Sequence, residues 1–272
     1  MKNLKIVLVC LFFATITFFS CSDISDPLVS GIDEPYNEPS EKPYDGPYDI
    51  DEPYNFPLKP GMPEWAELKT GIDKVNALQI PQDILRRMTT RALVETCLNY
   101  PLYITTIMLA SSRKVGMEHM TKNFNGCVEL LKRKDAYIYL SEKFLLFDPL
   151  AINEEWSDGV KGVNYTFELV KIELLLAQDI VLLSTSYENK IALLKEVLSK
   201  HEKMSTQPDY VVYLFSCEQL FFLMGKILQN SGNPDILSLV VNNKEIFKFL
   251  ETGDLYSYYI VDEILSIVKK IL

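Results

Sequence analysis

The 272-residue chain has 27 Lys and Arg residues against 37 Asp and Glu residues, which gives a formal net charge of −10. Ten of the acids but only two lysines lie within residues 22–60, so this stretch alone has a net charge of −8. Residues 61–272 hold 27 acids and 23 bases, a net charge of −4. Neither part has the basic surface that a phosphate backbone requires, so we expect no nucleic-acid partner.

Residues 1–20 have the composition of a secretory signal peptide. Lys2 and Lys5 make the first residues positive, Ile6–Phe19 are almost entirely apolar, and Ser20 supplies a small residue at the cut site. Charge, apolar core and small residue follow one another as they do in signal peptides. The apolar run of about 14 residues is also shorter than the ~20 that a membrane-spanning helix needs. We therefore expect residues 1–20 to be removed from an exported protein.

A cysteine follows the expected cut site directly. Cys21 and the residues before it resemble the lipobox of bacterial lipoproteins, although Phe18 stands where that family usually has leucine. The resemblance implies cleavage before Cys21 and attachment of several acyl chains, which together anchor a protein stably. Asp23 and Asp26 resemble the acidic export signal of some Gram-negative surface lipoproteins. The implied location is the outer membrane, on its cell-surface or periplasmic side; the alternative is an ordinary secreted protein cut near Ser20.

Residues 21–63 are predicted to form a disordered acidic stalk. Nine of the 14 prolines lie here, and four Pro-Tyr pairs recur at residues 35–36, 43–44, 47–48 and 53–54. Proline fixes φ and disfavours a helical residue before it, and the repelling acids favour an extended chain. Some forty such residues could reach about 120 Å when fully extended. The tyrosines are either incidental to a spacer or part of a recognition motif.

Apolar residues recur at a spacing of three or four from Glu64 onward, which predicts helices to the end of the chain. A turn is expected at Asn123–Gly126 and an acidic loop at Asp148–Gly159. The predicted helical runs are 64–78, 82–88, a helix capped by Thr89 and ended by 99–101, then 102–120, 128–147, 165–183, 187–204, 208–229, 235–250 and 254–272.

These runs place residues 64–272 in one all-α domain. No alternating strand with hairpin chemistry stands out, and the short connections suit two architectures. One is a helical-hairpin stack of the armadillo or HEAT type; the other is a compact multi-helix bundle. Residues 88–101 and 123–135 resemble a group of uncharacterised bacterial proteins, lipid-anchored or secreted, with an all-helical domain. That resemblance implies a fold and a location but no activity.

Three cysteines remain once Cys10 leaves with the signal peptide and Cys21 is acylated. Cys97, Cys127 and Cys217 lie far apart, without the CxxC spacing of zinc or redox sites. Their odd number argues against a disulfide framework, although one bridge is possible in an oxidising compartment. Buried free thiols are the expected state.

Few constellations of side chains indicate chemistry. The expected loop contains Asp148, Asn153, Glu154 and Asp158, oxygen donors that could hold a hard cation weakly, although the spacing is not that of an EF-hand. A solvated acidic loop explains the same residues. No metal and no cofactor are therefore expected. His119 lies eight residues before Cys127, so the sequence allows but does not favour a cysteine hydrolase.

Tyrosines form two clusters within the predicted helical domain. They comprise Tyr137 and Tyr139, and Tyr256, Tyr258 and Tyr259 near the end of the chain. Tyrosine suits interfaces and sugar stacking, but it also suits the half-buried surface of a helix.

The leading expectation from the sequence is a non-catalytic cell-envelope lipoprotein, anchored to the membrane through Cys21. Its helical domain would act as a scaffold that binds an envelope or host protein. The first alternative is a glycan-binding accessory of a surface nutrient-uptake system. The second is a cell-envelope hydrolase that uses Cys127 or a pair of acids.

Overall fold

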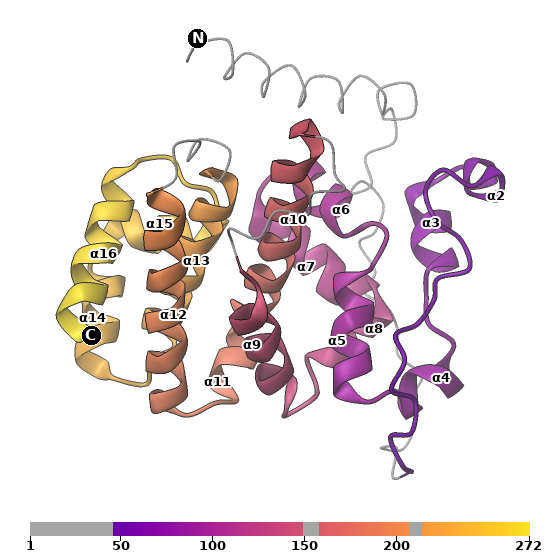
Figure 1. Cartoon of the computed structure of the whole chain (residues 1–272), viewed down its shortest axis with the longest axis horizontal. Coiled ribbons are helices and arrows are strands. Elements are labelled where there is room, and N and C mark those ends of the chain that lie inside the picture. The colour runs from indigo at the N-terminus through magenta and orange to yellow at the C-terminus, as the bar shows by residue number, and fades with distance from the viewer. Residues whose placement is uncertain (1–45, 149–157, 207–213) are drawn as a thin grey trace.

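A computed structural model describes residues 46–148, 158–206 and 214–272. Across these three ranges the chain forms fifteen helices and no named strand, which confirms the all-α class. The helices follow one another along the long axis of the molecule, from α2–α4 at one end to α14–α16 at the other (Figure 1). Such serial order is the order of a helical-hairpin stack.

The predicted runs and the observed helices agree best at 187–204, where a single helix was expected and is found. The bounds are α2 Pro63–Glu67, α3 Gly71–Ala77, α4 Gln82–Arg87, α5 Thr90–Leu98, α6 Tyr103–Leu109, α7 Arg113–Asn123, α8 Asn125–Leu130, α9 Ala136–Leu146, α10 Asp158–Leu176, α11 Asp179–Leu183, α12 Tyr187–Ser205, α13 Leu214–Gln229, α14 Pro234–Val241, α15 Lys244–Thr252 and α16 Tyr259–Ile271.

Five of the predicted runs are each divided into two helices by a break inside the run; in the run 128–147 the break is residues 131–135, between α8 and α9. Thr70 and Asp73 form a capping box that starts α3, and Ser112 accepts a hydrogen bond from the Val115 N–H at the start of α7. Asn243 accepts from two backbone N–H groups at the start of α15. Gln178 lies at the start of α11 with no side-chain cap. Apolar spacing continues across each break, so periodicity alone did not reveal it.

The expected turn at residues 123–126 is shorter than predicted, because α7 ends at Asn123, only Phe124 lies between the helices, and α8 begins at Asn125. The buried side chain of Asn125 accepts from the Ile80 N–H at 3.0 Å and donates to the Ile80 carbonyl at 2.7 Å. Its own N–H donates to Gln79 Oε1 at 2.9 Å. Asn125 therefore fastens the segment between α3 and α4 to the start of α8.

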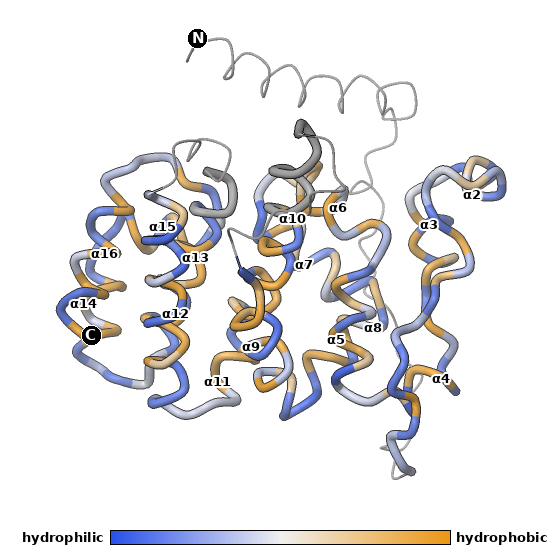
Figure 2. Tube along the Cα trace, in the orientation of Figure 1, coloured by the Kyte–Doolittle hydropathy of each residue, from blue (hydrophilic) through white to orange (hydrophobic). Residues whose placement is uncertain are grey.

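The core runs through the middle of the array, where α10 packs against α9 and α13, and α12 and α14–α16 pack on α13. Hydrophobic residues gather along these inner helices (Figure 2). Leu169, Val170 and Leu175 of α10 are fully or almost fully buried, which agrees with its expected central position. In the part of the chain that is described, no helix combines the length and the apolar character needed to cross a membrane.

Buried lysines close the carbonyl ends of neighbouring helices. Lys171 of α10 donates to the carbonyl of Leu98, the last residue of α5, at 2.8 Å. Lys190 of α12 donates to the Asn230 carbonyl, one residue beyond α13, at 2.8 Å. Lys200 of α12 donates to the carbonyls of Leu145 and Phe147 at the end of α9. The last four carbonyls of a helix lack partners within the helix, and a cation there also suits the helix dipole.

The ordered domain begins before residue 64. Residues 46–60, which we expected in the stalk, lie against α4 and α5. The Arg87 guanidinium binds the Asp49 carboxylate through two nitrogens, at 2.9 and 2.8 Å. Ile50 pairs with Met88 in an isolated parallel β-bridge. The Tyr54 N–H donates to Thr96 Oγ1 of α5 at 2.8 Å. Residues 1–45, including Cys21 and most of the predicted stalk, lie outside the described residues.

An aromatic side chain anchors this segment in the core. Phe56 is only 3% exposed, and its ring lies 6.0 Å from Tyr100 and 5.9 Å from Phe124, centroid to centroid. Tyr100 in turn stacks on Phe124 at 4.1 Å. Tyr48, in contrast, covers the Arg133 guanidinium from outside and remains half exposed. Residues 46–60 are therefore part of the folded unit.

Replacement of Phe56 tests this extension of the domain. Phe56→Ala should lower the free energy of unfolding by about 3–5 kcal/mol, the usual cost of emptying a buried phenyl site. Tyr48→Ala is the matched control and should cost about 1 kcal/mol or less, since it removes one exposed cation–π contact. Urea unfolding of the chain from Ser22 measures both. A loss of about 1 kcal/mol or less from Phe56→Ala would contradict the anchoring of residues 46–60 in the fold.

One carboxyl group in the core has no hydrogen-bond partner. Glu173 of α10 is 1% exposed, and neither of its carboxylate oxygens is hydrogen-bonded. Burial raises the pKa of Glu173 well above its usual range, and the nearby Lys200 ammonium opposes that rise only in part. The folded protein therefore holds the Glu173 proton more tightly than the unfolded chain does. Stability should be highest below the ordinary glutamate pKa and fall as the pH rises from there to the raised pKa of the folded state.

Glu173→Gln removes this titration while keeping the shape of the side chain. The variant and the wild type should have similar unfolding free energies near pH 4.5. The variant should become more stable than the wild type as the pH rises to 8, by about 1.4 kcal/mol for each pH unit over which only the folded wild type keeps the Glu173 proton. Denaturation at a series of pH values measures the difference, with Glu67→Gln on the exposed side of α2 as control. A constant difference at all pH values would contradict the raised pKa.

Candidate functional site

The expected cation loop is not assembled within the described residues. Asp148 lies exposed after α9, and Asp158 is the first residue of α10. Asn153 and Glu154 lie outside the described residues, as does the predicted lipidation site, Cys21. Within the described ranges, no three His, Cys, Asp or Glu side chains come together as a metal site would require.

The cysteine that a hydrolase would use is inaccessible. Cys127 of α8 has no exposed surface, and Cys97 of α5 is buried as well. His119 lies half-buried on α7, and among the described residues no hydrogen bond joins its ring to a thiol. A nucleophilic thiol needs access to its substrate and a lowered pKa. Burial instead raises the pKa of the Cys97 thiol, so this pair does not support nucleophilic catalysis.

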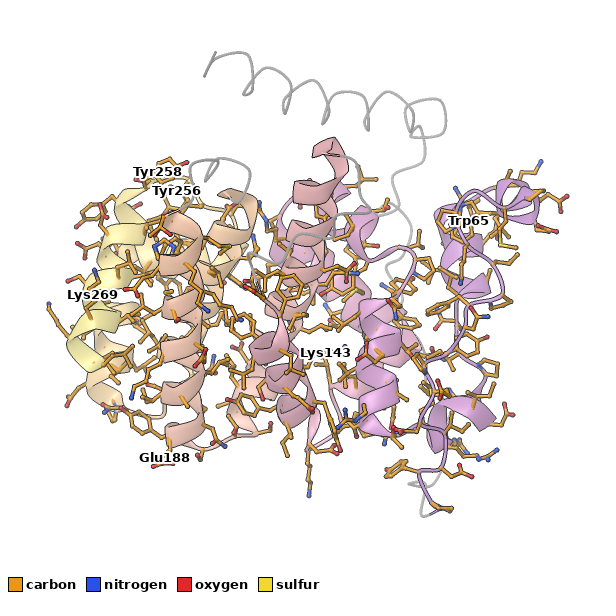
Figure 3. The ribbon with its side chains drawn as sticks, viewed as in Figure 1. Trp65, Lys143, Glu188, Tyr256, Tyr258 and Lys269 are labelled. Atoms are coloured by element: carbon orange, nitrogen blue, oxygen red, sulfur yellow. The ribbon has the colours of Figure 1, made fainter. Side chains whose placement is uncertain are left out.

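The two tyrosine clusters have different environments. Tyr137 is buried in α9 and donates to the Asn189 carbonyl at 2.9 Å, so it is a core residue. Tyr258 and Tyr259 are 70% and 57% exposed and lie at the start of α16, after the predicted helix start at 254. Tyr256 lies nearby with its ring against the Lys248 ammonium, 4.3 Å away (Figure 3). The C-terminal tyrosines therefore form an exposed aromatic patch.

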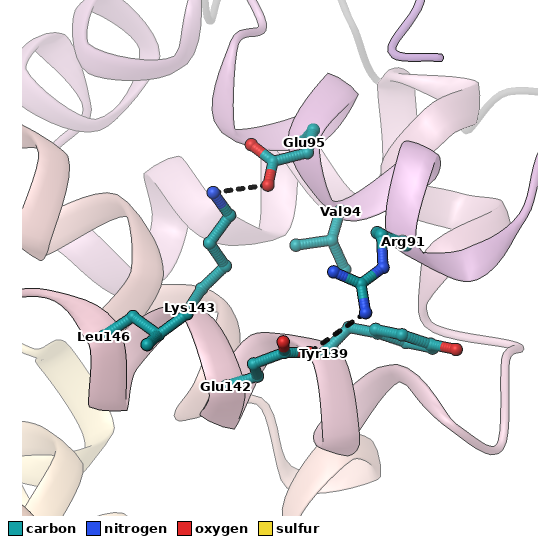
Figure 4. Close-up of a pocket in the computed structure, with 7 residues that line it drawn as sticks. All are labelled: Arg91, Val94, Glu95, Tyr139, Glu142, Lys143 and Leu146. Carbon is teal, nitrogen blue, oxygen red and sulfur yellow. Dashed lines mark hydrogen bonds and ion pairs between the residues drawn. The ribbon is translucent and has the colours of Figure 1, made fainter. Parts of the chain in front are cut away.

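A small groove of about 90 Å³ lies between α5 and α9 (Figure 4). The residues of each helix that line it follow i, i+3, i+4 spacing, so they share one face of that helix. Arg91, Val94 and Glu95 come from α5, and Tyr139, Glu142, Lys143 and Leu146 come from α9.

Paired charges span the groove between its two helices. The Arg91 guanidinium lies 3.5 Å from the Glu142 carboxylate and 5.2 Å from the centre of the Tyr139 ring. The Lys143 ammonium pairs with the Glu95 carboxylate. Both cations are therefore matched by anions, and the groove has no strong charge of one sign. Such a surface suits a mixed polar and apolar ligand better than a highly charged one.

Exposed apolar side chains adjoin the groove along α9. Leu146 at its end is 76% exposed, and Ile138 and Leu145 are 60% and 50% exposed. Helical spacing places Ile138 and Leu145 beside Glu142, on the side away from Lys143. Apolar residues next to an arginine and a tyrosine are the composition of an interface centre, whereas scattered single apolar residues are ordinary.

A second, polar cleft of about 200 Å³ lies between α7, α13 and α15. Arg113 of α7 pairs there with Glu218 at 2.7 Å and with Asp254 at 2.6 Å. Burial raises the pKa of Glu218, and the Arg113 guanidinium opposes the rise. These ion pairs join parts of the chain that are far apart in sequence. A structural role therefore explains the charged side chains of this cleft.

The sequence indicated Tyr139 as a surface candidate but did not indicate Arg91 or Leu146. Arg91 and Glu142 lie 51 positions apart, and only the packing of α5 on α9 joins them. The sequence does show that Leu145 and Leu146 follow Phe144 without a polar residue between them, so at least one of them must leave the buried face of the helix.

Comparison with known proteins adds nothing to this geometry. The chain matches no known family model, no curated protein and no solved structure. The site must therefore be interpreted from its own chemistry.

The groove residues should contribute little to folding. Arg91→Ala and Lys143→Ala should each change the free energy of unfolding by about 1 kcal/mol or less, because exposed ion pairs are weak. Leu140→Ala removes a buried side chain of α9 and should lower the free energy of unfolding by about 2–5 kcal/mol. Thermal and urea unfolding compare the three variants. A large loss in Arg91→Ala would assign the groove charges a structural role.

Proposed function

We propose that this chain is a non-catalytic lipoprotein of the cell envelope whose helical domain binds a protein partner through the groove between α5 and α9. The observation that carries the binding proposal is the stacking of Arg91 on Tyr139 beside exposed Leu145 and Leu146. Arginine and tyrosine are enriched among residues that dominate binding energies, and apolar neighbours exclude water around them.

The charges of the groove indicate what the partner should look like. Its contact surface would combine an apolar centre, to cover Leu145 and Leu146, with both acidic and basic groups at the edge. Arg91 and Lys143 each already have an acidic neighbour, so the partner would exchange ion pairs rather than neutralise a charged surface. Exchange of this kind favours specificity over raw affinity.

The lipoprotein part of the proposal is supported by the sequence of residues 1–26. The positive start, the apolar core and Cys21 after Ser20 favour a lipid anchor, and Asp23 and Asp26 favour the cell surface. Metabolic labelling with a radioactive fatty acid tests it. Label should be incorporated by the wild type and lost in Cys21→Ala; label that persists in the variant would refute anchoring at Cys21.

A second candidate function, glycan binding, is favoured by the exposed tyrosines of α16. Tyr258 and Tyr259 present large aromatic faces at the end of the array, and Tyr256 lies beside them. Flat aromatic faces suit stacking against sugar rings. This surface lies apart from the groove between α5 and α9, so the two candidates can be tested separately.

A capture experiment with matched variants decides between the two. The bait is the soluble chain from Ser22, because residues 46–60 belong to the fold, and the source is detergent-solubilised envelope of the host. One envelope protein should be retained by the wild type and by Lys269→Ala on α16. Its recovery should fall at least roughly tenfold with Arg91→Ala/Tyr139→Ala, as expected for loss of an interface centre.

Two other results would favour different conclusions. Equal recovery with the groove variant would contradict the groove as the binding site. Binding to a polysaccharide that is lost in Tyr258→Ala/Tyr259→Ala, with no protein retained, would replace protein binding by glycan binding.

A further inference from the structure

One face of α16, at the end of the helical array, carries a regular seam of five side chains (Figure 1). Tyr258, Asp262, Leu265, Lys269 and Leu272 follow one another at spacings of four, three, four and three residues. This alternation averages 3.5 residues, as in a coiled coil, so the five side chains lie along one face of the helix. Tyr258 and Leu272 are 70% and 41% exposed, the two charged side chains are exposed, and Leu265 is half-buried.

The apolar members of the seam are unusual for the end of an array. Terminal units of stacked helical proteins present a polar outer face, because no further unit covers it. Asp262 near the start of α16 and Lys269 near its end suit the helix dipole, which accounts for the two charges. The dipole does not account for Tyr258, Leu265 and Leu272. The seam therefore has the composition of a surface that another helix covers.

The order of the side chains selects the helix that fits. From either end the seam is apolar, charged, apolar, charged and apolar, with the acid and the base in mirrored positions. In an antiparallel pair of identical helices centred on Leu265, Asp262 of each copy would lie opposite Lys269 of the other. Tyr258 would lie opposite Leu272, and Leu265 opposite its own copy. A parallel pair would place like charges together, so the seam is complementary to itself only in the antiparallel arrangement.

The two charged side chains are available for such pairing. Within the described ranges, neither Asp262 nor Lys269 has an ion-pair or hydrogen-bond partner for its side chain. They are seven residues apart, or about 10 Å along the helix, which is too far for them to pair with each other.

We propose that α16 pairs with α16 of a second copy of this chain in an antiparallel, two-fold symmetric dimer. The same surface would be used by both copies, as in most homodimers. The seam is about 21 Å long, and a single helix from each copy makes an interface at the small end of the specific range. We therefore expect a dissociation constant in the micromolar range. The groove between α5 and α9 lies elsewhere in the array, so the dimer does not depend on its partner.

Sedimentation velocity of the chain from Ser22 tests the dimer and its orientation. The wild type should shift to a species of twice the mass as its concentration rises through the micromolar range. Asp262→Lys and Lys269→Asp should each raise the dissociation constant at least roughly tenfold, because each places two pairs of like charges across the interface. The double variant Asp262→Lys/Lys269→Asp should return it to within about threefold of the wild type, since both pairs attract again.

Asp83→Lys is the matched control and should leave the dimer unchanged, since it reverses an exposed acid in the first turn of α4. Circular dichroism checks that each variant is folded. A wild type that stays monomeric at every concentration, or a dimer that survives Asp262→Lys, would overturn the proposal. Single reversals that abolish the dimer without recovery in the double variant would also overturn it. None of these outcomes depends on whether the groove binds a partner.

Cross-linking at the two-fold axis gives a second readout. Leu265→Cys is combined with Cys217→Ser in the same soluble chain, so that the added thiol is the accessible one, since Cys97 and Cys127 are buried. A short bismaleimide should link two such chains through residue 265. Ser238→Cys, exposed on α14, is the control and should give little linked product. Equal linking by the two variants would contradict the pairing of α16 with its copy.

Discussion

The helical array depends on hydrogen bonds to the carbonyl groups at the ends of its helices, inside the protein. A stack of short helices places many chain ends next to the core, and carbonyls buried there without partners would be costly. Lys171, Lys190 and Lys200 reach from one helix to the last carbonyls of another, and each is more than nine-tenths buried. A lysine stem also packs well among apolar side chains while its ammonium group meets the carbonyls. The three lysines thus contribute both apolar packing and hydrogen bonds to the buried carbonyls.

Glu173 shows the limit of this arrangement. It faces Lys200, but its oxygens have no hydrogen-bond partner, and the ammonium group of Lys200 is directed to the end of α9. An isolated charge in such a place is strongly disfavoured, so the carboxyl keeps its proton instead. A lysine is therefore tolerated in this core where its ammonium group can donate hydrogen bonds to the carbonyls at a helix end.

The sequence predicted the fold class and the long helices well, because an amphipathic period is a local property. It did not predict the breaks inside five helical runs, although Thr70, Ser112 and Asn243 are all residue types that start helices. The residues around them keep the apolar spacing of a continuous helix, and that spacing hides the helix starts. Asn125 was read as a turn residue for its type, whereas its hydrogen bonds to Ile80 depend on a contact 45 positions away.

The site was less predictable than the fold. The groove combines Arg91 with Tyr139 across two helices, and each looks like an ordinary surface residue in its own segment. Proline content similarly concealed the role of Phe56, since composition describes a segment as a whole and not its single buried ring. The C-terminal tyrosines were found because they are close in sequence, and their exposure was decided only by packing.

The position of residues 46–60 determines where on the array a lipid anchor at Cys21 would be attached. With a lipid at Cys21, residues 21–45 would be the linker between the membrane and the folded domain. A linker of 25 residues reaches about 80 Å when extended. The described chain begins at the α4 end of the array, and α14–α16 lie at the opposite end (Figure 1). The tyrosines of α16 lie at the end of the array far from the point of attachment, whereas the groove between α5 and α9 lies nearer to it (Figure 1). A neighbour in the same membrane and a ligand arriving from outside would thus meet different surfaces of one molecule.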